Sequence, residues 1–161
     1  MILGLSLAQF TFLHVFLSLV GIGAGVFVIY GLLNSLRLRI LTALFFVTTV
    51  TTSLTGFLFP FNGVTPGIIL GILSMIALVL AIVALYGKAL AGPWRGVYVL
   101  GVCVAFYFNF FVLVAQGFAK VPALQAAAPT MASPAFGITQ AAVLVIFVLL
   151  TIRAFKRFDP A

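Results

Sequence analysis

Charged residues are scarce in this chain. Its 161 residues include one acidic and eight basic residues, so only 6% are charged, whereas 65% are hydrophobic. Soluble globular domains have about one quarter charged residues. A soluble fold of this composition would have too little charged surface to stay in solution. The sequence therefore predicts a membrane protein, built as one helical domain over residues 1–161.

The residues that carry most enzyme chemistry are nearly absent as well. His14 is the only histidine, Cys103 the only cysteine, and Asp159, in the C-terminal tail, the only acid. This inventory lacks a Ser/His/Asp set and paired carboxylates, which disfavours classical hydrolytic or transfer catalysis, although enzyme activity stays open. It also predicts no metal site. Cys103 falls inside an apolar run, which favours a buried, inert thiol over a reactive one.

Five long apolar runs organise the chain, and each is long enough to cross a bilayer as a helix. The first run has no preceding Lys or Arg and is too long for a secretory signal, so we expect it to be retained as a helix. An odd number of spans excludes two equal inverted halves within one chain, but not transport by an oligomer. The predicted all-α bundle has transmembrane spans at about 10–34, 38–60, 66–88, 94–118 and 136–157.

The basic residues predict how this bundle is oriented. Seven of the eight fall on one side of a five-span arrangement, and only Lys120 falls on the other. Because Lys and Arg are enriched in cytoplasmic loops, we expect the N-terminus outside and the C-terminus in the cytoplasm. Their scattered placement disfavours nucleic-acid binding. The seven residues are Arg37, Arg39, Lys88, Arg95, Arg153, Lys156 and Arg157.

The connector at 119–135 is the longest segment outside the predicted spans. It is rich in Ala and Pro and nearly uncharged, whereas a flexible solvated linker would be more polar. We expect it to lie on the bundle or membrane surface, with a short helix around 122–127, or alternatively to form a contact surface for another chain.

Two pairs of glycines predict where helices pack closely. Gly21 and Gly25 lie four residues apart in the first span, and Gly67 and Gly71 repeat this spacing in the third. Such pairs let two helix backbones approach each other, which is a main source of helix association in lipid.

Hydroxyl groups are concentrated in the stretch TTVTTSLT, residues 48–55, of the second span. Small hydroxyl side chains either favour close packing, with each hydroxyl bonded to its own helix, or line a cavity. On the first span, His14 and Ser18 share a helix face with Gly21 and Gly25. His14 either makes one interhelical hydrogen bond or binds a ligand.

Under the predicted orientation, polar residues of four spans lie in the outer half of the membrane, whereas the inner half is almost purely apolar. Intramembrane polar groups usually face a bundle interior or a cavity. This asymmetry predicts a polar pocket open to the outer face, and it disfavours a continuous channel. The aromatic run AFYFNFF, residues 105–111, either stacks on a flat cofactor or provides packing bulk. The candidate pocket residues are His14, Ser18, Thr52, Thr55, Asn109, Gln116 and Gln140.

Two stretches, TSLTGFLFPF and NFFVLVAQGFAKVPALQAAAPT, together with the five-span layout, resemble a family of small uncharacterised bacterial inner-membrane proteins. The resemblance implies a location in the bacterial inner membrane. It implies no activity and no catalytic residues. The segment MASPAF, which follows, is less polar than this resemblance implies.

Three hypotheses about function remain at this point. The first is an accessory or structural subunit of a larger membrane complex, possibly an energy-transducing one, with other subunits or copies of the chain as partners. The second is a binding protein for a small lipophilic ligand, such as a quinone or a haem, in the outer pocket around His14. The third is a small oligomeric transporter.

Overall fold

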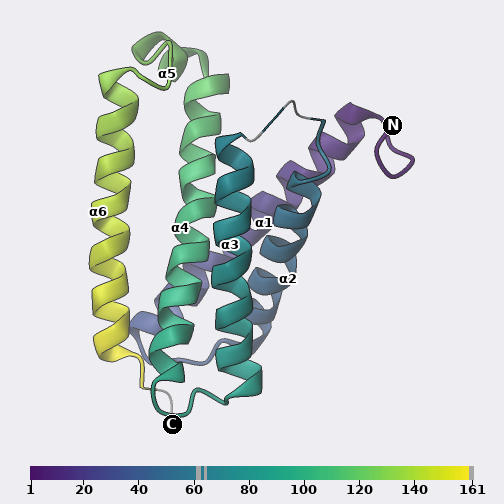
Figure 1. The fold of residues 1–161 in the computed structure, drawn as a ribbon. Helices are drawn as coiled ribbons and strands as arrows, with labels where there is room; N and C mark the ends of the chain where they lie inside the picture. The colour runs from purple at the N-terminus through teal and green to yellow at the C-terminus, as the bar shows by residue number, and fades with distance from the viewer. Residues whose placement is uncertain (61–62, 64, 160–161) are drawn as a thin grey trace.

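The computed structural model of the protein describes residues 1–60, 63 and 65–159, and this part of the chain is all-helical. Five of its helices are long and apolar enough to cross a membrane. Figure 1 shows them as an elongated bundle. In chain order the elements are α1 (Leu7–Leu33), α2 (Arg39–Gly56), α3 (Pro66–Ile82) continued by a π-helical turn η1 (Val83–Gly87), α4 (Trp94–Lys120), the short α5 (Pro122–Ala127) and α6 (Pro134–Arg157).

The helix ends differ from the predicted spans by a few residues, for local reasons. α1 begins three residues earlier than predicted because Ser6 and Gln9 form a capping box, in which each side chain accepts a hydrogen bond from the other's backbone N–H. α2 ends at Gly56 rather than Pro60, since a proline disfavours helical geometry in the residue before it. Part of the predicted FPFNG turn, residues 61–62, lies outside the described residues.

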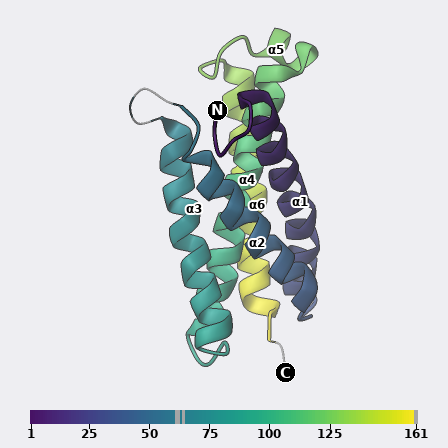
Figure 2. The same cartoon turned by 90° about the vertical axis from the view of Figure 1, so that its right-hand side faces the viewer.

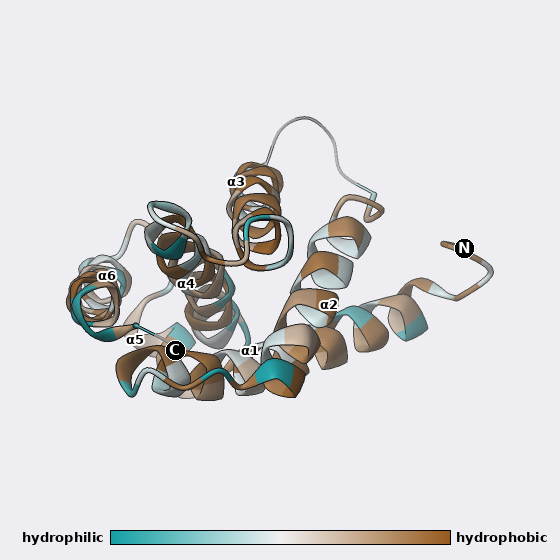
Figure 3. Cartoon of the chain, turned by 90° about the horizontal axis from the view of Figure 1, so that it is seen from below, coloured by the Kyte–Doolittle hydropathy of each residue, from teal (hydrophilic) through white to brown (hydrophobic). Residues whose placement is uncertain are grey.

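Helices α6, α4 and α3 stand in a row, and α1 and α2 pack on one side of that row (Figure 3). α1 runs obliquely across the row (Figures 1 and 2). It packs against α2 and also contacts α4 and α6. α4 contacts α1, α3 and α6, and is therefore the central helix of the bundle.

The glycine pair of α1 packs closely, as predicted. A Cβ atom on Gly21 would lie 3.0 Å from Thr48 Oγ1 on α2. A Cβ atom on Gly25 would lie 2.6 Å from the Phe106 ring on α4. Both positions therefore need glycine for the approach of the neighbouring helix.

The second glycine pair behaves differently from its prediction. A Cβ atom on Gly71 would lie 2.8 Å from the Phe57 ring, but one on Gly67 would meet nothing closer than Thr65 Oγ1 at 3.8 Å. The closest helix approach in α3 instead involves Gly101 of α4, which the sequence analysis missed. A Cβ atom there would lie 2.7 Å from the backbone oxygen of Ala77.

The connector after α4 folds back on the bundle. It contains α5, which confirms the predicted short helix at these residues. Ala128, just after α5, is buried against Ala115 of α4 and Phe136 of α6. Figures 1 and 2 show this segment covering the ends of α4 and α6. Its expected contact with the bundle surface is therefore confirmed.

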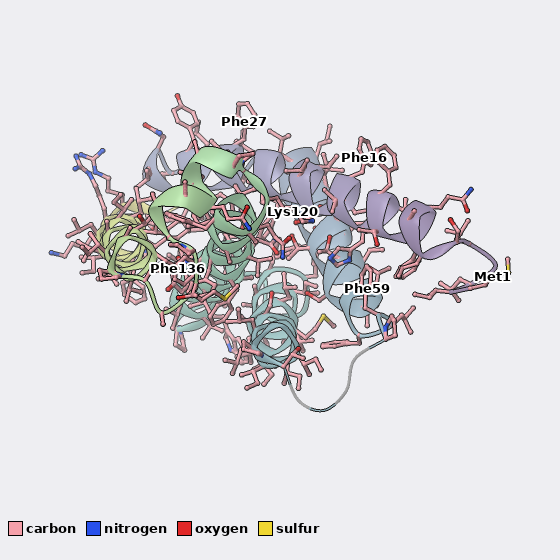
Figure 4. The ribbon with its side chains drawn as sticks, turned by 90° about the horizontal axis from the view of Figure 1, so that it is seen from above. Met1, Phe16, Phe27, Phe59, Lys120 and Phe136 are labelled. Atoms are coloured by element: carbon pink, nitrogen blue, oxygen red, sulfur yellow. The ribbon has the colours of Figure 1, made fainter. Side chains whose placement is uncertain are left out.

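The seven basic residues with a shared predicted side all lie at or near one end of the bundle. The α1–α2 loop, the η1–α4 loop and the end of α6 meet at the bottom of Figure 1. We call this the basic end. Lys120 lies at the opposite end, the far end, which Figure 4 views from above.

Candidate ligand-binding site

A cavity of about 250 Å³ lies between α1, α2, α3 and α4 in the half of the bundle toward the far end. We call it the far-end cavity. It is formed by the beginning of α1, the end of α2, the beginning of α3 and the middle of α4. Among the described residues, His14 is the only acidic or basic side chain that lines it. Its polar lining consists of His14, Ser18, Thr52, Ser53, Thr65, Ser74 and Asn109.

His14 is held in place by the hydroxyl cluster of α2. Its Nδ1 lies 2.9 Å from Thr55 Oγ1. That hydroxyl has one proton and lies 2.8 Å from the carbonyl oxygen of Thr51, which can only accept it. When the Thr55 hydroxyl donates to the Thr51 carbonyl, Nδ1–H of His14 donates to Thr55, and Nε2 of His14 is left as a hydrogen-bond acceptor.

Two hydroxyls that line the cavity have no partner. Thr52 Oγ1 and Ser74 Oγ are buried, and neither makes a hydrogen bond within the described residues. The two residues are 8% and 3% exposed, respectively. Buried polar groups are nearly always hydrogen-bonded, because an unmade bond costs about 1–3 kcal/mol. Two such hydroxyl groups face the same cavity, where they are free to bond to a polar molecule.

The other hydroxyls of residues 48–55 follow both interpretations of the sequence. Thr48, Thr51 and Thr55 donate to carbonyls of their own helix, as simple packing requires. Thr49 instead accepts a bond of 3.2 Å from Asn109 Nδ2, which joins α2 to α4. The hydroxyl cluster of residues 48–55 thus joins α2 to α4, and the part of it nearest the far end lines the far-end cavity.

The apolar part of the wall combines aromatic rings with aliphatic side chains: Phe57, Phe59, Phe108, Ile68, Leu70 and Val112. The Phe59 ring, labelled in Figure 4, packs edge-on to His14 with centroids 5.1 Å apart. Most of the aromatic run in α4 has another role. Phe106 and Tyr107 pack on Phe147 of α6, so this part provides packing bulk between helices.

The structure brings together five of the seven predicted pocket residues. His14, Ser18, Thr52 and Asn109 line the cavity, and Thr55 holds the imidazole. Gln116 is exposed on α4, outside the cavity. Gln140 is on α6, where its Nε2 donates to the Phe111 carbonyl at 3.0 Å.

Ser74 of α3 is the functional candidate that sequence analysis missed. It is the one hydroxyl residue inside the 17 residues of this helix, and that isolation is the signal that could have identified it. α3 therefore contributes the wall that the sequence analysis assigned to the fifth span.

The described residues contain no group of three or more His, Cys, Asp or Glu side chains close enough to hold a metal ion. Comparison of the chain with family models, with curated proteins and with solved structures found no match.

Proposed function

We propose that this chain is a multi-pass membrane protein with its far end outside and its basic end in the cytoplasm. Four of the five long helices have 22–27 residues, or about 33–40 Å at 1.5 Å per residue, against a hydrocarbon core of about 30 Å. The collection of Arg and Lys at one end supports this orientation. The resemblance described above supports the bacterial inner membrane.

Within that membrane, we propose that the protein binds a small, uncharged, lipophilic molecule with a polar ring, such as a quinone head group. The observation that carries this proposal is the pair of unpartnered hydroxyls of Thr52 and Ser74 in the far-end cavity. A quinone carbonyl or a quinol hydroxyl would provide the missing partners. Nε2 of His14, as an acceptor, suits the hydroxyl of a quinol.

The size and charge of the cavity narrow the ligand class. Pockets for drug-sized ligands span about 300–1,000 Å³. A cavity of about 250 Å³ therefore suits a single ring better than a haem macrocycle. Because the lining carries no fixed charge, an ionic ligand would lose its hydration without gaining an ion pair.

Transport has less support than binding. The buried residues next along α3 and α4 toward the basic end are apolar: Leu78, Val102 and Phe106. A polar solute would find no hydrogen-bonding side chains among these three residues, and on this side the buried hydroxyls come from α2, at Thr49, Thr48 and Thr42. The hypothesis of an accessory subunit stays a prediction of the sequence, and the extraction described at the end of the Discussion tests it.

Binding of a short-chain benzoquinone, in its oxidised and reduced forms, to the detergent-purified protein tests this proposal. The double variant Thr52→Val/Ser74→Ala removes both unpartnered hydroxyls, and we expect it to weaken binding by at least tenfold. The matched control is Thr51→Val on the same helix, because the Thr51 hydroxyl bonds to its own helix outside the cavity. Equal affinity in the wild type and the double variant would refute the site.

His14→Ala provides a second test of the same site. We expect it to reduce binding of the quinol more than binding of the quinone, since Nε2 can only accept a hydrogen bond in the tautomer described above. An equal loss for both forms would contradict this role for His14.

A further inference from the structure

A second cavity, of about 290 Å³, lies at the basic end, and the proposed function does not use it. We call it the basic-end cavity. Its walls come from the α1–α2 loop, the beginning of α2, the turn η1, the start of α4 and the residue after α6. Arg37 and Arg39 line it, and the two inner polar groups are the side chains of Thr42 and Tyr98.

The C-terminal segment closes one wall of this cavity. Phe158 is 1% exposed, and its ring lies 5.5 Å from that of Tyr98. Arg95 Nη1 donates to the Phe158 carbonyl oxygen at 2.6 Å. The backbone N–H of Asp159 donates to Ser35 Oγ at 2.8 Å. The segment is therefore fixed to the first turn of α4 and to the α1–α2 loop, and it forms a defined wall.

The same contacts leave the two cavity arginines without an acidic partner. Asp159 is the only acidic side chain of the sequence, and it lies 3.6 Å from Arg95 Nη1. Neither Arg37 nor Arg39 makes a salt bridge or a side-chain hydrogen bond within the described residues. Among the described residues no acidic side chain pairs with these two guanidinium groups, so they give the cavity a positive charge.

Uncharged groups of the basic-end cavity also favour the binding of an anion. α2 begins at Arg39, and its N-cap residue, Leu38, offers no side-chain bond to the free N–H groups of the first turn. A helix start of this kind attracts negative charge. Thr42 and Tyr98 are 5% and 4% exposed, so their hydroxyls belong to the interior wall rather than to the surface.

The backbone beside the cavity is also irregular. The π-helical turn η1 contributes Leu85 and Tyr86 to the wall, and Ala89 beyond it has a positive φ of 47°. π-helical turns and strained non-glycine residues occur preferentially at functional sites.

We propose that the basic-end cavity binds a phosphate-type oxyanion, held by the forked N–H groups of Arg37 and Arg39. A guanidinium group can donate two parallel N–H hydrogen bonds to the oxygens of one phosphate, and the cavity offers hydroxyl donors at its base. The expected source is the head group of an anionic phospholipid in the cytoplasmic leaflet. That source rests on the proposed orientation, whereas the oxyanion site itself does not depend on orientation or on the far-end cavity.

Native mass spectrometry of the detergent-purified protein, titrated with phosphatidylglycerol, tests the proposal. We expect one tightly bound lipid per chain, and at least a tenfold weaker affinity in Arg37→Gln/Arg39→Gln. The matched control is Lys156→Gln/Arg157→Gln, which removes the same charge from exposed positions on α6 that do not line this cavity. Arg37 and Arg39 are exposed as well, so the control differs in lying outside the cavity, and we expect it to change affinity by less than about twofold.

A conservative variant separates geometry from charge. Arg37→Lys/Arg39→Lys keeps both charges but loses the paired N–H donors, and we expect it to bind more weakly than the wild type. Circular dichroism checks that each variant is folded. Equal losses in the pocket variant and the α6 control would overturn the proposal, because that pattern indicates general charge attraction.

Inorganic phosphate is the second arm of the experiment. If phosphate binds with the same dependence on Arg37 and Arg39 and phosphatidylglycerol does not, the oxyanion site stands and its ligand is a free phosphate compound. If both bind with this dependence, the lipid head group is supported. If neither ligand depends on the two arginines, the proposal is wrong.

Discussion

Replacing Thr52 by valine should stabilise the empty protein and weaken its ligand binding at the same time. Thr52 is 8% exposed, and its buried hydroxyl has no hydrogen-bond partner. An unmade bond of this kind costs about 1–3 kcal/mol, and valine keeps nearly the same shape without the polar atom. We expect a stabilisation of about 1 kcal/mol, or a rise of about 2–4 °C in the apparent Tm of a chain of this size.

A bound ligand should reverse the effect of Thr52→Val on the apparent Tm. A hydrogen bond between Thr52 and a bound ligand contributes about 1 kcal/mol net, so its loss should weaken affinity by about fivefold. The assay is thermal unfolding in detergent, with and without a saturating short-chain quinol. Thr51→Val is the control, because its hydroxyl already bonds to the Val47 carbonyl at 2.7 Å. A lower Tm for empty Thr52→Val would refute the reasoning, since it would mean that the hydroxyl is already satisfied in the empty protein.

Three further predictions concern packing and orientation. Gly101→Ala should destabilise the α3–α4 contact by about 1–3 kcal/mol in chemical unfolding, whereas Gly23→Ala should not, because nothing lies within 4 Å of a Cβ atom there. Phe158→Ala should cost about 3–5 kcal/mol, since this 1% exposed ring belongs to the main hydrophobic core, and an unchanged Tm would contradict that role. A cysteine introduced at Thr130 should react with a membrane-impermeant reagent in intact cells, whereas one introduced at Lys156 should not. The reverse pattern would overturn the proposed orientation.

The sequence predicted the helices well because they are long apolar runs bounded by turn-forming residues. Pro66 begins α3 as expected, and the end of α6 at Arg157 coincides with the predicted limit. The differences at the other ends arise from specific contacts. The capping box of Ser6 and Gln9 extends α1, and Pro60 shortens α2.

Which helices are neighbours could not be predicted in the same way. Apart from the hydroxyl cluster of α2, the long helices are apolar on nearly every face, so hydrophobic patterning does not reveal the face that packs. Among the glycines, the closest approach to the backbone of another helix joins Gly101 to Ala77, and neither residue belongs to a predicted glycine pair. Phenylalanine rings fill the space beside several glycines, as Phe106 does at Gly25, and such pairs are distant in sequence.

The candidate site was predicted only in part, again because the sequence does not reveal which helices are neighbours. The hydroxyl cluster and His14 share helix faces that the 3.6-residue period reveals, and the structure places them at one cavity. Gln140 was predicted to line the pocket but bonds to α4 instead, and Ser74, for which no role was predicted, lines the cavity, because the neighbours of α3 and α6 depend on packing. The basic-end cavity combines residues from loops and both ends of the chain, which no local pattern connects.

The central claim, that the far-end cavity holds a small lipophilic ligand, is tested most directly by what remains bound after gentle extraction. Wild-type protein would be purified from native membranes in mild detergent and analysed by mass for small molecules and for other subunits. We predict a bound quinone-type molecule in the wild type and in Thr51→Val, and its absence from Thr52→Val/Ser74→Ala. Partner proteins in fixed ratio, with no such molecule in the wild type, would contradict the account and favour an accessory subunit.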